Sequence, residues 1–81
     1  MKKQFSPKDI EDVLATIKQV IAYRFKEKGW QCYNSLHECW GILDEEVIEF
    51  KQAVHDNEKN EALKELIDIA TAAILGIASE V

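Results

Sequence analysis

Two acidic motifs placed symmetrically about a polar turn constrain this chain more than any other feature. Each motif holds two carboxylates three residues apart, Glu46 with Glu49 and Glu65 with Asp68. On a helix, both members of a pair would lie on one face, about 4.5 Å apart along the axis. The polar stretch HDNEKN lies between the motifs, and a chain reversal there has its midpoint at Asn57. Reflection about Asn57 superimposes the two motifs, so an antiparallel helical hairpin would bring four carboxylates to the same height.

Such a group of carboxylates predicts a bound cation, because like charges at that density repel one another strongly. In the segment LIDIATAAILGIA, residues 66–78, Asp68 and Thr71 are the polar side chains. A helix that is apolar on all sides is usually buried, so we expect Asp68 to be desolvated and to need a partner.

A helical projection of the preceding segment indicates which acids face inward. Glu46 falls at the edge of an apolar stripe and Glu49 lies beside it, whereas Glu45 points away. The inner ligands would then be Glu46 and Glu49. The alternative is a solvated acidic face in which Glu45 and Glu49 pair with lysines such as Lys51 or Lys64. The apolar stripe consists of Leu36, Trp40, Leu43, Val47, Phe50 and Val54.

Capping signals divide the chain into three helices. Ser6 followed by Pro7 predicts the start of a first helix, which has apolar residues at spacings of three and four and ends at Gly29. Ser35 predicts the start of a second helix over 36–55, and a third is expected over 58–80. We therefore predict an all-α fold in a single domain, residues 1–81, whose second and third helices form an antiparallel hairpin.

Several apolar residues remain outside the principal stripes, and one small chain has too few helices to cover them. They are Ile42, Ile48, Ala53, Ile69, Ala72 and Leu75. We expect them to be buried between copies of the chain, in a homodimer or homotetramer that completes a larger helical bundle. Ala72 and Gly76 are small residues four apart, which would allow another helix to approach closely.

Composition limits the partners and the compartment. The net charge of −5 and the scattered basic residues disfavour a nucleic acid polymer as partner. The N-terminal residues lack the apolar core of a signal peptide, and the longest apolar run is too short and too acidic to span a membrane, so a cytoplasmic protein is expected. Cys32 and Cys39 are then most simply free thiols, and a zinc site made from them with His37 and His55 fits no common spacing.

The connector before the second helix holds the candidate substrate contacts. Trp30 and Tyr33 could stack on a nucleotide base or could close the end of a small helical core. His37, in the first turn of the second helix, is a further candidate for substrate binding, although a neutral imidazole there is usually structural.

The acidic motifs resemble those of a known family. The pattern E-E-x-x-E in residues 45–49, followed by E-x-x-D in residues 65–68, is similar to that of the all-α nucleotide pyrophosphohydrolases of the MazG type. Relatives include dimeric dUTPases, dCTP pyrophosphatases and phosphoribosyl-ATP pyrophosphatase. The segment SLHECWGILDEEVIEF, residues 35–50, also looks like the H-E-x-x-G-x-x-x-E-E form of phage and mobile-element members.

The resemblance implies a function and a role for each acid. Glu46, Glu49, Glu65 and Asp68 would hold Mg²⁺, with Mn²⁺ as a possible substitute. Glu45 and Glu46 would act in catalysis, Glu45 from an outer position that orients water. The implied reaction splits a nucleoside triphosphate into a monophosphate and pyrophosphate. No fourth helix, which many members use for phosphate and base contacts, is predicted here.

Two other functions remain open at the level of sequence. One is a non-catalytic helical oligomer that serves as a metal-binding or protein-interaction module. The other is a redox carboxylate bundle with iron or manganese, which usually places a histidine three residues after a glutamate. Glu-x-x-His does not occur in this sequence, which disfavours the redox bundle.

Overall fold

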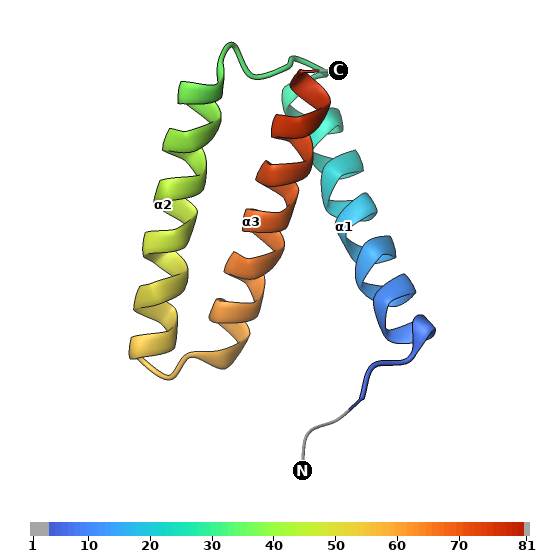
Figure 1. Ribbon diagram of the computed structural model, residues 1–81, viewed down its shortest axis with the longest axis vertical. Coiled ribbons are helices and arrows are strands. Elements are labelled where there is room, and N and C mark those ends of the chain that lie inside the picture. The colour runs from blue at the N-terminus through green and yellow to red at the C-terminus, as the bar shows by residue number, and fades with distance from the viewer. Residues whose placement is uncertain (1–3, 81) are drawn as a thin grey trace. The chain divides into compact units, whose positions relative to one another are not determined.

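The chain is all-α, as predicted. The computed structural model describes residues 4–80 and contains three helices and no strand in that range (Figure 1). They are α1 (Pro7–Lys28), α2 (Leu36–His55) and α3 (Lys59–Ser79). The helices divide into two compact units, one that ends at Trp30 and contains α1, and one that begins at Gln31 and contains α2 and α3. None of the helices described is long and apolar enough to cross a membrane.

Helix α1 begins and ends where its capping residues predicted. The Ser6 hydroxyl accepts a hydrogen bond from the backbone N–H of Asp9, and the Asp9 carboxylate accepts one from the backbone N–H of Ser6. This reciprocal capping box satisfies two donors that the first turn would otherwise leave unpaired. At the other end Gly29 adopts a positive φ of 83°, which a residue without a Cβ accepts at low cost. The Trp30 ring then stacks on Phe25, with ring centroids 4.0 Å apart.

Helix α2 has the predicted bounds, and Ser35 caps its N-terminus. The Ser35 hydroxyl accepts a hydrogen bond from the backbone N–H of Glu38. The Glu38 carboxylate reaches past Ser35 and accepts hydrogen bonds from the backbone N–H and the side-chain amide of Asn34. Glu38 therefore has a structural role at the start of α2.

The turn between α2 and α3 is centred on Asn57, as predicted from the polar stretch. Asn57 has a φ of 58°, in the left-handed region that asparagine tolerates better than most residues. The backbone N–H groups of Asp56 and Glu58 donate to the carbonyls of Gln52 and Ala53, which closes the last turn of α2. The two helices consequently run antiparallel and side by side (Figure 1).

Small side chains let α2 and α3 approach closely. Cys39 and Ala53 on α2 are buried, as are Ala62, Ala72 and Gly76 on α3. The contact is close at Gly76, where an added Cβ would overlap Sγ of Cys39. The Cys39 thiol lies 4.0 Å from the carbonyl oxygen of Ala72. A helix does approach closely at Ala72 and Gly76, but it is α2 of the same chain, whereas the sequence analysis expected burial there between chains.

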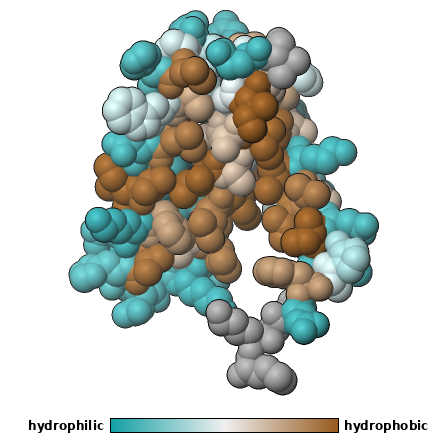
Figure 2. Space-filling model, in the orientation of Figure 1, coloured by the Kyte–Doolittle hydropathy of each residue, from teal (hydrophilic) through white to brown (hydrophobic). Residues whose placement is uncertain are grey.

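The assignment of helix faces from sequence was wrong in one respect. Ala53 and Ala72 were expected to be buried between chains, yet they are 5% and 4% exposed within this single chain. Conversely, much of the principal apolar stripe of α2 is exposed, with Trp40 at 68% and Val54 at 53%. Hydrophobic surface is visible over the hairpin in Figure 2. The reason is that the small residues, rather than the bulky ones, allow the helices to meet at short range.

Candidate metal centre

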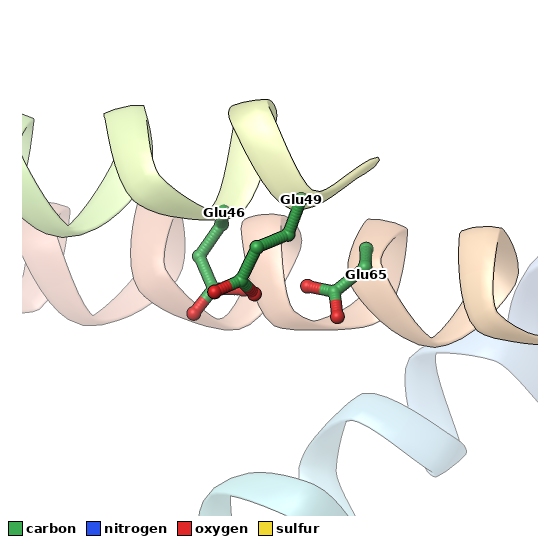
Figure 3. Close-up of side chains that lie close together, drawn as sticks. All are labelled: Glu46, Glu49 and Glu65. Carbon is green, nitrogen blue, oxygen red and sulfur yellow. The ribbon is translucent and has the colours of Figure 1, made fainter. Parts of the chain in front are cut away.

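Three glutamates from two helices converge inside the hairpin. Glu46 and Glu49 extend from α2 toward α3, and the carboxylate of Glu65 on α3 points toward them (Figure 3). One oxygen from each of the three lies within 4.8 Å of the others. This spacing is short enough for a single small cation to contact all three carboxylates.

The local sequence explains why these side chains meet. Glu46 and Glu49 lie almost one turn apart on α2, so they share a face. The turn at Asn57 places Glu65 opposite Glu49, as the reflection predicted. The alanine pair Ala53 and Ala62, nearer the turn, keeps the two helices close at this height. Glu65 is consequently buried, with 3% of its surface exposed.

Two oxygens of the cluster lack a hydrogen-bond donor when the acids are ionised. Oε2 of Glu46 and Oε2 of Glu65 are both buried without a donor among the described residues. Buried polar atoms are nearly always paired, and an unpaired buried carboxylate is costly. A proton or a metal ion would satisfy these oxygens. Since the donor set is entirely carboxylate oxygen, it fits hard cations such as Mg²⁺ and Mn²⁺.

The pKa values of the three glutamates are shifted by burial and by their interactions with one another. Burial raises the pKa of Glu46 from 4.5 to about 7, and the interaction with Glu65 and the charges of Asp68 and Glu49 add to the effect. The pKa of Glu49 is also raised, mainly by its interaction with Glu65. Burial alone would raise the pKa of Glu65, but hydrogen bonds from protonated Glu46 and Glu49 and the charge of Lys64 lower it. Without metal, Glu46 therefore keeps a proton to a higher pH than a solvated glutamate does.

Asp68, the fourth predicted ligand, lies beside this trio and pairs with a lysine. Its carboxylate oxygen Oδ2 is 3.6 Å from Nζ of Lys64, one turn earlier on α3. Its side chain is 31% exposed, so it is less buried than its apolar neighbourhood suggested. Asp68 is still close enough for its charge to raise the pKa of Glu46. The structure thus brings three of the four predicted ligands together and holds the fourth at the edge.

Lys64 interacts with three acids of the site, an arrangement that was not predicted from the sequence. Its Nζ lies 3.8 Å from Oε1 of Glu61, 3.7 Å from Oε1 of Glu65 and 3.6 Å from Oδ2 of Asp68. The charges of Asp68, Glu65 and Glu61, in that order, raise the pKa of Lys64. The signal in the sequence was the spacing of acids three residues before Lys64 and four residues after it, which places them on its face of the helix.

A pocket of about 410 Å³ adjoins the carboxylates on the side of the turn. Among the described residues its lining holds five acids and one basic residue, Lys64, so an anionic ligand would meet repulsion there unless a cation were bound. The lining consists of Glu49, Gln52, Ala53, Asp56, Glu58, Glu61, Lys64 and Glu65.

The remaining candidates on the α2–α3 unit lie outside the trio. Glu45 is exposed on α2, and its charge contributes to the raised pKa of Glu49. His37 is exposed in the first turn of α2, about 13 Å along the helix from Glu46. Tyr33 lies at the end of the hairpin opposite the turn, where its backbone N–H donates to Oγ of Ser79 at 3.0 Å. Tyr33 thus ties the connector to the end of α3.

Trp30 belongs to the α1 unit. Its ring stacks on Phe25 and is 79% exposed. Stacking on Phe25 covers one face of the ring and leaves the other accessible, so a role as a platform for a base stays a prediction.

Comparison of the chain with protein-family models, with curated proteins and with solved structures found no match. The carboxylate geometry and the motif spacing therefore carry the functional argument.

Proposed function

We propose that this protein is a Mg²⁺-dependent nucleoside triphosphate pyrophosphohydrolase of the MazG type. The observation that carries the proposal is the convergence of Glu46, Glu49 and Glu65, with buried oxygens on Glu46 and Glu65 that lack a donor. An acidic cluster on a protein surface would have no such unpaired buried atoms. The motif resemblance supports the reaction, since the same three acids match positions that hold metal in that family.

The proposed site assigns separate tasks to the acids. Glu46, Glu49 and Glu65 would hold the metal, with Asp68 as the fourth ligand beside them. Glu45, on the same helix but exposed, would orient the attacking water. When bound, Mg²⁺ would contact phosphate oxygens and neutralise the charge that develops as the bond between the α and β phosphates breaks. The adjoining pocket has room for phosphate groups.

Base recognition is assigned to residues outside the cluster. Trp30 and Tyr33 are proposed to stack on the nucleotide base, and His37 to contact the substrate near the start of α2. These residues lie outside the carboxylate trio, so their replacement is expected to change substrate affinity more than metal affinity.

We further propose that the active form is a homodimer or homotetramer in the cytoplasm. Within residues 4–80 no large side chain is completely buried, which is a weak core for a chain of this size. The exposed stripe of α2 includes Leu36, Trp40 and Val47 at 62%, 68% and 46% exposure. Burial of these residues against a second copy would supply the missing apolar contact.

A non-catalytic metal-binding or interaction module is the second candidate. It is favoured by Lys64, which partly neutralises the acids without any metal, and by the exposed apolar stripe. The two candidates differ in one measurable property, the release of pyrophosphate.

The test is a panel of canonical and modified nucleoside triphosphates assayed for pyrophosphate release with Mg²⁺. Wild-type protein should release pyrophosphate from at least one of them, and Glu65→Gln should lose activity by orders of magnitude, because it removes the charge of the most buried ligand. Glu11→Gln is the control, since Glu11 is an exposed glutamate of α1 that belongs neither to the trio nor to the lining of the acidic pocket.

Melting temperatures with and without metal test metal binding independently of turnover. Millimolar Mg²⁺ or Mn²⁺ should raise the melting temperature of wild-type protein and of Glu11→Gln, because the ion binds only the folded state. Glu65→Gln should respond weakly. Indifference of the wild type to both ions would exclude the metal site, and a metal response without pyrophosphate release from any nucleotide would favour the non-catalytic module.

A further inference from the structure

The position of Lys64 has a consequence for metal binding. We propose that Lys64 is an exchangeable counter-cation: its ammonium group neutralises the carboxylates in the metal-free protein and withdraws when a divalent cation binds. The inference rests on the metal site of the proposed function and adds a competitor for that site within the same chain.

The distances indicate that Lys64 is shared among the acids. Its Nζ is 3.6 to 3.8 Å from one oxygen each of Glu61, Glu65 and Asp68. A charge-assisted hydrogen bond between nitrogen and oxygen is shorter, about 2.7–2.9 Å. Lys64 thus contributes its charge to three acids and is locked onto none of them.

The exposure of the partners decides which one can move. The Lys64 side chain is 63% exposed, whereas that of Glu65 is 5% exposed. Lys64 has a flexible stem and can turn its ammonium group into water at small cost. Glu65 cannot leave the helix interface. A divalent ion that approaches Glu65 would therefore displace Lys64, and the carboxylates would stay in place.

Charge gives the direction of the exchange. Glu46, Glu49 and Glu65 form the trio, and Asp68 lies at its edge. A single ammonium group cannot balance several carboxylates, while a divalent ion brings twice the charge and binds several oxygens directly. Lys64 is also the single base in the lining of the acidic pocket, so no neighbouring lysine of that lining can replace it.

The experiment compares Mn²⁺ binding by the full chain, measured by electron paramagnetic resonance and calorimetry. Lys64→Met should bind Mn²⁺ about threefold to tenfold more tightly than wild type, the range expected when a few weak exposed ion pairs no longer compete. Lys59→Met is the matched control, because it removes the same charge from the start of α3 and should change the affinity less than twofold. Lys64→Arg keeps a competing cation and should bind no more tightly than wild type.

Metal-free melting in a chelator supplies the second readout. Lys64→Met should melt at a lower temperature than Lys59→Met, since the acids lose their counter-charge. Equal Mn²⁺ affinity for wild type and Lys64→Met would overturn the exchange while leaving the metal site intact. Absence of Mn²⁺ binding in every variant would overturn both. Tighter binding by Lys64→Met without pyrophosphate release from any nucleotide would support the exchange and reject the hydrolase.

Discussion

The contact between Gly76 and Cys39 sets the spacing of α2 and α3, and a single methyl group should test it. A Cβ at position 76 would overlap Sγ of Cys39, which is itself buried. Overpacking of this kind costs about 1–3 kcal/mol. Replacing glycine by alanine in a helix interior stabilises the folded state by about 1 kcal/mol, because it lowers the conformational entropy of the unfolded chain. Gly76→Ala should therefore reduce the free energy of unfolding by about 1 kcal/mol.

The same change should have the opposite sign once the sulfur is removed. In Cys39→Ala protein, the nearest remaining atom of residue 39 is its Cβ, 3.7 Å from the added methyl, which is an ordinary contact. Gly76→Ala should then stabilise by about 1 kcal/mol, because the propensity gain is no longer opposed. The coupling between the two positions is the difference, about 2 kcal/mol.

Urea unfolding followed by circular dichroism would measure all four proteins of this cycle. Protein concentration must be constant, because association would add to apparent stability. Mn²⁺ affinity should follow the same pattern, weaker in Gly76→Ala and restored in the double variant, since separation of the helices draws Glu46 and Glu49 away from Glu65. An equal loss of stability in both backgrounds would refute the contact, and stabilisation by Gly76→Ala alone would mean that the helices are not held at this distance by residues 39 and 76.

Three further predictions address charge, assembly and the division of roles. In a chelator, the protein should lose stability as pH rises from about 5 through 7, because the pKa of Glu46 is raised from 4.5 to about 7 and the folded state then binds more protons than the unfolded state. Mg²⁺ should reverse this trend. Melting temperatures that do not change with pH would contradict the prediction. Light scattering at micromolar concentration should report a dimer or tetramer for wild-type protein and a smaller species for Trp40→Glu, since Trp40 is 68% exposed in the single chain. A monomeric wild type would rule out the oligomer. In the pyrophosphate assay, Glu49→Gln should lose orders of magnitude in turnover and Glu45→Gln less, because only Glu49 belongs to the trio; equal losses would place Glu45 among the ligands.

The sequence by itself determined the helices, their ends and the opposition of Glu49 and Glu65. Ser6 and Ser35 satisfy backbone donors locally, and Asn57 accepts a left-handed conformation at a polar turn. These effects act within a few residues, so they can be read without knowing the fold. Once the turn was fixed at Asn57, the opposition of Glu49 and Glu65 followed from helical geometry alone.

Only the tertiary structure decided which faces meet. Periodicity identifies an apolar face but not the surface that covers it. The stripe that contains Trp40 is more hydrophobic than the face that contains Cys39 and Ala53. The latter nevertheless contacts α3, because Cys39 packs against Gly76 and Ala53 is small enough to be buried near the turn. Packing at short range depends on the shape of both partners, which no single helix specifies.

The contacts inside the candidate metal centre were also decided by the tertiary structure. Spacing placed Asp68 equivalent to Glu46 in the reflection, but in the fold Asp68 pairs with Lys64 while Glu46 meets Glu65. Helical spacing fixes where each Cβ lies, whereas the long side chain of Lys64 reaches three acids at similar distances. Which carboxylates are desolvated depends on the helix interface, and the interface exists only in the folded hairpin.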